Sequence, residues 1–362
     1  MTKIVIIGGG IVGAMIAYEL STCAHLDITL IEQHQSASGS TGAALGVLMG
    51  AISQKIKGRA WKLRENSLKR YETLIPELES LTGQTIPYNR QGIVMLGLTQ
   101  DELDKWQTLV EIRHAQGWDL ELWTTEELLK HCPQVQNDRV LGALYSKSDR
   151  QVHPTLLTQA LITGASIKGI ECILGQKVQK FKITPLNNDN TSHCSHIQTD
   201  KGVFDADWVI VSGGIGSKLL TTSLAQTVDI QPVLGQAIHL KLPQTMENVA
   251  FQPVITGDDV HIVPLGSGEY WIGATVEFSD EANLNLLEWV TEQAIAFCPE
   301  LKKGEIIRTW SGKRPRPVGQ AAPVIKPLDG YDNVLLATGH YRNGVLLAPA
   351  TAQMIKEMIL AY

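Results

Sequence analysis

The sequence lacks the features that mark several large classes of protein. Its 31 Lys and Arg are outnumbered by 37 Asp and Glu, which leaves a formal net charge of −6, so neither nucleic acid nor an anionic membrane surface would attract it. Its five cysteines are scattered and form no Cys-x-x-Cys pair, which argues against a disulfide framework and indicates a reducing compartment. No run of about 18 apolar residues predicts a membrane span, and no signal-peptide pattern is present. We therefore expect a cytoplasmic protein.

Catalytic and metal-binding signatures are also scarce. No catalytic triad and no acid–base pair stands out. His193, Cys194 and His196 are potential metal ligands, but their spacing fits no common zinc pattern. The surrounding segment, residues 185–196, is polar and turn-prone, which predicts a surface hairpin loop. We expect no metal site.

The length and the hydrophobic pattern indicate two domains. The 362 residues exceed what one hydrophobic core usually serves. Residues 3–7 are β-branched and apolar, which is typical of a buried parallel strand. A helix is predicted over residues 10–24 and a second strand over 27–32. Residues 230–280 alternate as in an antiparallel sheet, and a late buried strand is predicted at 333–337, before a final helix that begins near Gly344.

A glycine-rich turn separates the first strand from the first helix. It reads Gly-x-Gly-x-x-Gly and is formed by Gly8, Gly10, Ile11, Val12 and Gly13. Such a turn lets the backbone approach a pyrophosphate, and the helix amides stabilise its negative charge. Glu32 ends the second strand 19 positions after Gly13, where a carboxylate can accept hydrogen bonds from a ribose diol. The pattern predicts a dinucleotide site.

The choice of dinucleotide follows from the rest of the chain. The carboxylate of Glu32 would repel a 2′-phosphate, so NADP is not expected. The turn alone does not decide between NAD and FAD. A nicotinamide dehydrogenase usually continues with further alternating β-α units, whereas here the middle is antiparallel and a glycine-ended strand comes late. Because a flavin ring lies far from its adenine, it needs chain that returns late to cover it, and this favours FAD.

Further motifs follow in a recognisable order. They lie at residues 8–32, 40–46, 152–154, 212–214, 272–275 and 312–315, and the most specific is Gly-His-Tyr-Arg-Asn-Gly-Val-Leu-Leu-Ala-Pro at 339–349. Together they resemble the D-amino acid oxidase superfamily, most closely its glycine oxidase branch, over nearly the whole chain. The resemblance implies an α/β fold, in which a Rossmann-like FAD-binding domain of the glutathione-reductase type is interleaved with an α+β substrate domain built on an antiparallel sheet.

The resemblance also implies domain boundaries and cofactor contacts. The FAD-binding domain is expected at residues 1–87, 151–230 and 310–362, and the substrate-binding domain at 88–150 and 231–309. FAD is expected to be non-covalent, because no cysteine lies near the Gly-x-Arg-Pro turn that carries the covalent link in related sarcosine oxidases. For His340, a purely structural role agrees with the sequence as well as a flavin contact does. Beyond the glycine turn and Glu32, the expected FAD contacts are Ser40, Thr41, Gly46, Val178, Gly213, Gly339, His340, Arg342, Asn343, Gly344 and Val345.

The resemblance implies oxidation of the C–N bond of a small amino acid: glycine, sarcosine or a small D-amino acid. A hydride passes from the α-carbon to flavin N5, the resulting imine hydrolyses to an oxo acid or enters thiamine synthesis, and molecular oxygen is reduced to hydrogen peroxide. Two alternatives stay open. One is a dehydrogenase that passes electrons to a quinone or a protein partner, and the other is a flavin-binding subunit of a larger assembly. The resemblance also suggests a homo-oligomer.

Three residues are the expected catalytic residues. Arg314 is the first choice for the substrate carboxylate, because a guanidinium binds a carboxylate through two parallel hydrogen bonds; Arg316 competes for this role. Arg342 is the second candidate. His261 stands where glycine oxidases carry a tyrosine that assists the carboxylate, so the identity of the substrate stays open.

Overall fold

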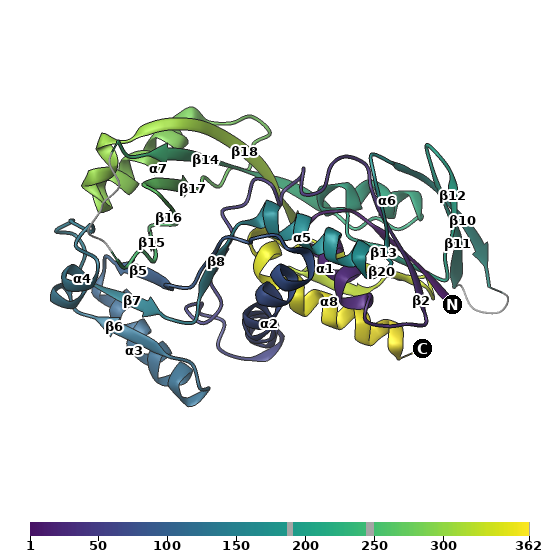
Figure 1. Cartoon of the computed structure of the whole chain (residues 1–362), viewed down its shortest axis with the longest axis horizontal. Helices are drawn as coiled ribbons and strands as arrows, with labels where there is room; N and C mark the ends of the chain where they lie inside the picture. The colour runs from purple at the N-terminus through teal and green to yellow at the C-terminus, as the bar shows by residue number, and fades with distance from the viewer. Residues whose placement is uncertain (187–190, 244–249, 362) are drawn as a thin grey trace.

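The protein has two lobes, each built around its own β-sheet. The computed structural model describes residues 1–186, 191–243 and 250–361, and Figure 1 shows the lobes side by side, with both termini in the lobe that holds α1 and α8. The long strands β14 (Ile230–Lys241) and β18 (Glu305–Pro317) extend from one lobe toward the other. The α/β fold expected from the sequence is confirmed.

A six-stranded sheet forms the centre of the first lobe. Its order is β19-β20-β13-β1-β2-β9, and all of its neighbours pair in parallel except β19 with β20. These strands are almost uniformly apolar because both faces of the sheet are buried. They are β1 (Thr2–Ile7), β2 (Leu26–Glu32), β9 (Glu171–Leu174), β13 (Trp208–Val211), β19 (Val324–Pro327) and β20 (Val334–Thr338).

Different layers cover the two faces of this sheet. One apolar cluster packs β1, β2 and β13 against the helices α1 (Ile11–Leu20), α2 (Gly58–Thr82), α5 (Pro154–Ile167) and α8 (Gly344–Leu360). A second cluster packs alternate residues of the same strands against an antiparallel sheet of β10 (Val178–Pro185), β11 (Ser192–Thr199) and β12 (Val203–Asp205). The short helix α6 (Ser217–Ser223) follows β13.

The second lobe contains a mainly antiparallel eight-stranded sheet in the order β18-β14-β17-β16-β15-β5-β7-β6. One face packs on α7 (Leu284–Phe297) through Ile238, Ile262 and Ile272. The opposite face carries Ala237, Val263 and Trp271 toward the first lobe, which is the two-residue periodicity of a strand. The remaining elements are β5 (Ile93–Gly97), β6 (Leu120–Trp123), β7 (Gly142–Ser146), β15 (Val254–Gly257), β16 (Val260–Gly266), β17 (Glu269–Gly273), α3 (Gln100–Ala115) and α4 (Thr125–His131).

Two buried charged side chains hold residues 50–55, which lead from β3 (Val47–Leu48) to α2. β3 belongs to a small sheet with β8 (Arg150–Val152) and β4 (Tyr88–Asn89). The Asp149 carboxylate accepts hydrogen bonds from the amides of residues 50–52 at 2.7–2.8 Å. Arg113 donates to the carbonyls of residues 51, 53 and 55. Because buried charges require such partners, these bonds fix the path of residues 50–55.

Two local predictions were wrong. The first helix ends at Leu20 rather than 24, because the hydroxyls of Ser21 and Thr22 bond back to preceding carbonyls. The predicted hairpin loop 185–196 is shorter, since β11 begins at Ser192 and includes His193, Cys194 and His196; residues 187–190 of it lie outside the described residues. Cys194 is drawn into the core by two backbone hydrogen bonds to the Asn333 side chain. The domain boundaries stay a prediction.

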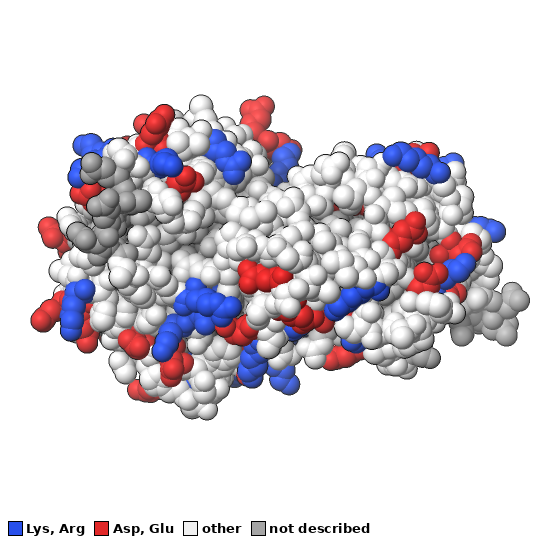
Figure 2. Space-filling model, in the orientation of Figure 1, with Lys and Arg blue, Asp and Glu red and all other residues white. Residues whose placement is uncertain are grey.

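The surface carries charges of both signs. On the face shown in Figure 2, Lys and Arg alternate with Asp and Glu and no large area has a single sign. All five cysteines are free thiols. Within residues 1–186, 191–243 and 250–361, no helix is both long enough and apolar enough to span a bilayer.

Gly13 provides a test of the packing that opens the fold. An alanine in a helix interior normally stabilises it relative to glycine, but a Cβ on Gly13 would lie 1.9 Å from the Gly8 carbonyl oxygen. We expect Gly13→Ala to lower the free energy of unfolding by about 1–3 kcal/mol through overpacking, measured by urea denaturation. Gly39→Ala is the control, because nothing lies within 4 Å of its Cβ. Equal stability of the two variants would contradict this account.

Candidate active site

A cavity of about 380 Å³ lies where the two lobes meet. Gly8, Ser212 and Thr338 line it, and they stand at the carboxyl ends of β1, β13 and β20. Ligands of open α/β sheets bind at this edge. From the other lobe, β14, β16 and β18 contribute Gly235, His261 and Arg314. The cavity therefore joins the predicted dinucleotide site to the predicted substrate residues.

The glycine turn forms one wall of the cavity. Gly10, Ile11 and Val12 line it, and α1 begins here without a side-chain cap. Gly8 has a φ of 117°, and a Cβ there would lie 2.6 Å from the Ser212 carbonyl oxygen. Gly13 does not line the cavity; it allows α1 to pack against the turn. This helix start, whose N-cap residue Gly10 has no side chain, fits a pyrophosphate.

Polar groups beside the turn suit the rest of a dinucleotide. The Glu32 carboxylate lines the cavity and accepts hydrogen bonds from the amides of Gly9 at 2.7 Å and His34 at 2.9 Å, so it is fixed where a ribose hydroxyl can reach it. The Thr41 hydroxyl accepts the Ile11 amide at 3.1 Å. Ser40 donates to the Lys313 carbonyl at 2.6 Å and ties this wall to β18. These residues fit FAD.

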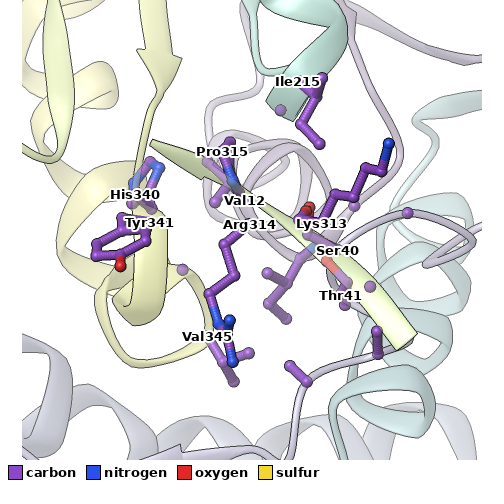
Figure 3. A pocket seen from close by; sticks show the side chains of 18 of the residues that line it. Val12, Ser40, Thr41, Ile215, Lys313, Arg314, Pro315, His340, Tyr341 and Val345 are labelled. Carbon is purple, nitrogen blue, oxygen red and sulfur yellow. Dashed lines mark hydrogen bonds between the residues drawn. The ribbon is translucent and has the colours of Figure 1, made fainter. Parts of the chain in front are cut away.

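Most of the late segment 339–345, which the sequence predicts to cover a flavin ring, also lines the cavity. Gly339 and Tyr341 have φ values of 65° and 53°, and α8 starts at Gly344 without a side-chain cap. In Figure 3 His340, Tyr341 and Val345 surround the start of this helix. The cavity is also lined by Gly46, Gly213, Gly339, Arg342 and Gly344, but not by Asn343 or Val178. FAD contacts from all of these residues stay predictions.

His340 has a structural role. Its side chain is buried, and Nε2 lies 2.9 Å from the Thr351 hydroxyl on α8. Burial lowers the pKa of His340 to about 3, so the imidazole is neutral at physiological pH. His340 therefore helps to fix the position of the segment 339–345 and adds no charge to the cavity.

Arg314 projects into the cavity from β18. Lys313 and Arg314 point to opposite sides in Figure 3. Nη1 of Arg314 donates to the carbonyls of Leu234 at 3.1 Å and Thr275 at 3.0 Å. Among the described residues, its Nε and Nη2 have no hydrogen-bond partner. Burial lowers the pKa of Arg314, as does the charge of Arg342, but a guanidinium remains protonated. One edge of the group is anchored and the other can bind a carboxylate.

Arg316, the competitor for this role, lies elsewhere. Its guanidinium carbon stands 5.4 Å from the centre of the Phe278 ring, and the residue does not line the cavity. Gly235 explains why Arg314 can occupy its place. A Cβ on Gly235 would lie 2.3–2.5 Å from the Arg314 guanidinium, so the guanidinium fills the space that a side chain would take.

Glu277, which supports the strand ends that anchor Arg314, was not identified from the sequence. Glu277 is buried and accepts hydrogen bonds from Thr275, from Gln236 Nε2 at 2.9 Å and from the Asn283 amide at 2.7 Å. Although burial raises the pKa of Glu277, these bonds hold it below its ordinary value. The carboxylate orders the strand ends on which Arg314 is anchored. No sequence motif marks Glu277, because its partners meet only in the folded sheet.

His261 and Arg342 lie close to Arg314 at the same end of the cavity. The Thr256 hydroxyl is 2.8 Å from His261 Nδ1, and Nε2 has no partner among the described residues. Burial lowers the pKa of His261 to about 4, and the charge of Arg342 acts in the same direction, so this imidazole is neutral at pH 7. Nη2 of Arg342 lies 2.9 Å from the Asp259 carboxylate. The three predicted catalytic residues are thus brought together.

Apolar side chains close this end of the cavity. Leu45, Val47, Ala237 and Ala274 line it and belong to a cluster that also contains Trp271. Trp271 and Trp310 pack edge to face with centroids 5.8 Å apart, and Trp310 Nε1 donates to the Ala43 carbonyl at 3.1 Å. These side chains give this end of the cavity an apolar wall.

Comparison with known proteins agrees with this geometry. The profile of a family described as FAD dependent oxidoreductase, DAO, matches residues 3–358. A bifunctional ThiO/ThiG protein of Synechocystis is 30% identical over 367 residues; the match covers 99% of this chain but 52% of that protein, so the chain spans about half its length. The glycine oxidase of Bacillus subtilis is 27% identical, and the match covers 98% of this chain and 92% of that protein.

Solved structures show the same relationship. The crystal structure of glycine oxidase from Bacillus cereus superposes with a TM-score of 0.87 and 25% sequence identity. The superposition covers 100% of this chain and 95% of that one. The likeness therefore includes both lobes.

The buried His340 predicts a pH dependence of stability. Its pKa of about 3 in the folded chain lies below the ordinary 6.5, so the unfolded chain binds more protons between these values and stability falls as the pH drops through this window. We expect His340→Gln to lessen the loss of unfolding free energy between pH 7 and pH 5 by about 2 kcal/mol, measured by urea denaturation at both pH values. An equal loss in both proteins would show that His340 is not buried in neutral form.

Proposed function

Because this chain belongs to the DAO family of FAD-dependent oxidoreductases, we propose that it oxidises the carbon–nitrogen bond of a small amino acid, with glycine as the first substrate to test. One observation carries the proposal: a partly anchored arginine, Arg314, stands in the same cavity as the FAD cradle and the start of α8. An anion site of this kind suits the carboxylate that all amino acids share.

The residues around Arg314 have distinct proposed tasks. Arg314 binds the substrate carboxylate through its free edge, and a hydrogen bond to a charged group contributes about 1.5–3 kcal/mol. The neutral His261 donates a further hydrogen bond from Nε2, in the place of the tyrosine of glycine oxidases. With the carboxylate fixed, we place the α-carbon and the amine toward the segment 339–345. Orientation of this kind supplies much of the catalysis of a bound reactant.

FAD, when bound, supplies the acceptor for the hydride that leaves the α-carbon. The uncapped start of α8 places backbone amides beside the cavity, and a helix N-terminus stabilises negative charge by about 0.3–1 kcal/mol, or up to about 2 when partly buried. The apolar wall around Trp271 keeps water from the reacting carbon. Oxidation of the amino acid yields an imine, and we propose molecular oxygen as the final acceptor, with release of hydrogen peroxide.

The relatives support this choice of substrate without fixing it. Proteins named glycine oxidase match over nearly the whole chain, and the ThiO/ThiG relative agrees with a role of the imine in thiamine synthesis. Residues Arg314 and Arg342 stand in the motifs that carry this resemblance. His261 is the clear departure, so sarcosine, D-alanine and D-proline belong in the same test.

The proposal is tested by the colour of the flavin. The purified chain is loaded with FAD and mixed without oxygen with glycine, sarcosine, D-alanine and D-proline in turn. We expect one of them to bleach the flavin bands, and oxygen to restore them with formation of hydrogen peroxide. Bleaching that oxygen reverses only slowly would indicate another electron acceptor. If the chain binds FAD and no amino acid reduces it, the proposed function is wrong.

Gly235 tests the role of Arg314 without altering the arginine. In Gly235→Ala the new Cβ would displace the guanidinium, so we expect acetate, a carboxylate without an amine, to bind about 10- to 100-fold more weakly. The melting temperature should change little, because a flexible side chain can move away. Binding is measured by the change in flavin absorbance. Gly216→Ala is the matched control, since Gly216 lines the cavity with nothing within 4 Å of its Cβ; equal affinities in both variants would refute the role.

A further inference from the structure

The turn between β15 and β16 is conformationally unusual. Its two central residues, Asp258 and Asp259, have φ values of 47° and 60°. A two-residue hairpin with both residues in the left-handed region matches the twist of the strands, but it normally contains glycine. Two aspartates there cost strain, and strained backbone is concentrated at binding sites and switches. These two carboxylates are therefore held at a point where the backbone is strained.

The two aspartates reach different partners. Asp259 Oδ1 lies 2.9 Å from Arg342 Nη2, across the junction of the lobes. Asp258 Oδ2 lies 3.7 Å from Arg139 on the outer surface. The Asp259 side chain is 71% exposed and that of Arg342 34% exposed, and Arg342 lines the cavity. The Asp259–Arg342 pair thus stands at the rim of the cavity.

This pair changes the charge that a substrate meets. Arg314 and Arg342 line the same cavity, and the charge of Arg342 lowers the pKa of Arg314, so together they could bind two carboxylates of one molecule. The Asp259 carboxylate already forms an ion pair with Arg342. The negative charge of Asp259 would also repel a second carboxylate of a ligand. An exposed ion pair contributes little to the free energy of unfolding. We therefore attribute the role of Asp259 to the position of its charge and not to stabilisation of the fold.

We propose that Asp259 is a specificity-determining residue: by holding Arg342, it restricts the cavity to amino acids with one carboxylate and rejects those with two. The inference rests on the proposed function, because it takes Arg314 as the site of the shared carboxylate. It predicts that removing the Asp259 charge admits dicarboxylates while leaving the binding of monocarboxylates nearly unchanged.

The test compares Asp259→Asn with Asp258→Asn in the FAD-loaded chain. Both variants remove one negative charge from the same turn, and asparagine tolerates the left-handed region well. Acetate, malonate and succinate are titrated by calorimetry, so no turnover is needed. We expect Asp259→Asn to tighten binding of malonate or succinate about tenfold or more relative to acetate. Asp258→Asn should leave that ratio within about twofold of the unmodified chain.

A double variant shows whether the effect passes through Arg342. In Asp259→Asn combined with Arg342→Met, the gain for dicarboxylates should disappear. An unchanged ratio in Asp259→Asn, an equal change in Asp258→Asn, or a gain that survives the loss of Arg342 would each overturn the proposal. Failure of acetate to bind any variant would overturn it as well.

The two proposals fail in different ways. If no amino acid reduces the flavin but Asp259→Asn still tightens the dicarboxylates, the amino acid oxidase function is wrong and the charge filter stands. If glycine reduces the flavin in the unmodified chain and in both single variants and the ratio does not move, the oxidase stands and the charge filter is wrong. As a second readout, kcat/KM for iminodiacetate relative to glycine should rise about tenfold or more in Asp259→Asn only.

Discussion

A guanidinium held away from water needs partners for its charge and its donors, and the cavity is organised around this need of Arg314. Nη1 uses two backbone carbonyls, and Glu277 and Asp259 supply negative charge nearby. Arg342 adds a second positive charge, so two arginines are balanced by two carboxylates. The free edge of Arg314 is the donor set that this arrangement leaves unfilled. A ligand carboxylate completes it, whereas an apolar ligand would leave these donors without partners.

The rest of the fold serves to bring this arginine beside the cofactor. β14 and β18 extend toward the first lobe, and Ser40 and Trp310 fasten β18 to the wall formed by residues 40–43. The segment 339–345 returns to the same cavity from the end of the chain. Because these parts lie about 300 positions apart in the sequence, the site exists only once both sheets are formed. Buried Asp149 and Arg113 keep residues 50–55 in place.

How far the sequence predicts the site depends on how local each signal is. The glycine turn and Glu32 were predicted because their spacing within one β-α-β unit carries the geometry. The choice of Arg314 over Arg316 came from resemblance, and the structure explains it through the space above Gly235. Asp149, Glu277 and Asp259 could not be predicted, since each acts on residues brought near by tertiary packing. The hairpin loop predicted at 185–196 was too long, because the polar character of the segment gave no sign that Cys194 is buried in a strand.

The most direct test of the account is a crystal structure of the chain with FAD and acetate bound. We predict that the acetate carboxylate lies on the free edge of Arg314, within hydrogen-bond distance of His261, with the flavin ring beside residues 339–345. Acetate bound away from Arg314, with that guanidinium contacting only Leu234 and Thr275, would contradict the central claim. The claim is that this arginine selects and orients the substrate.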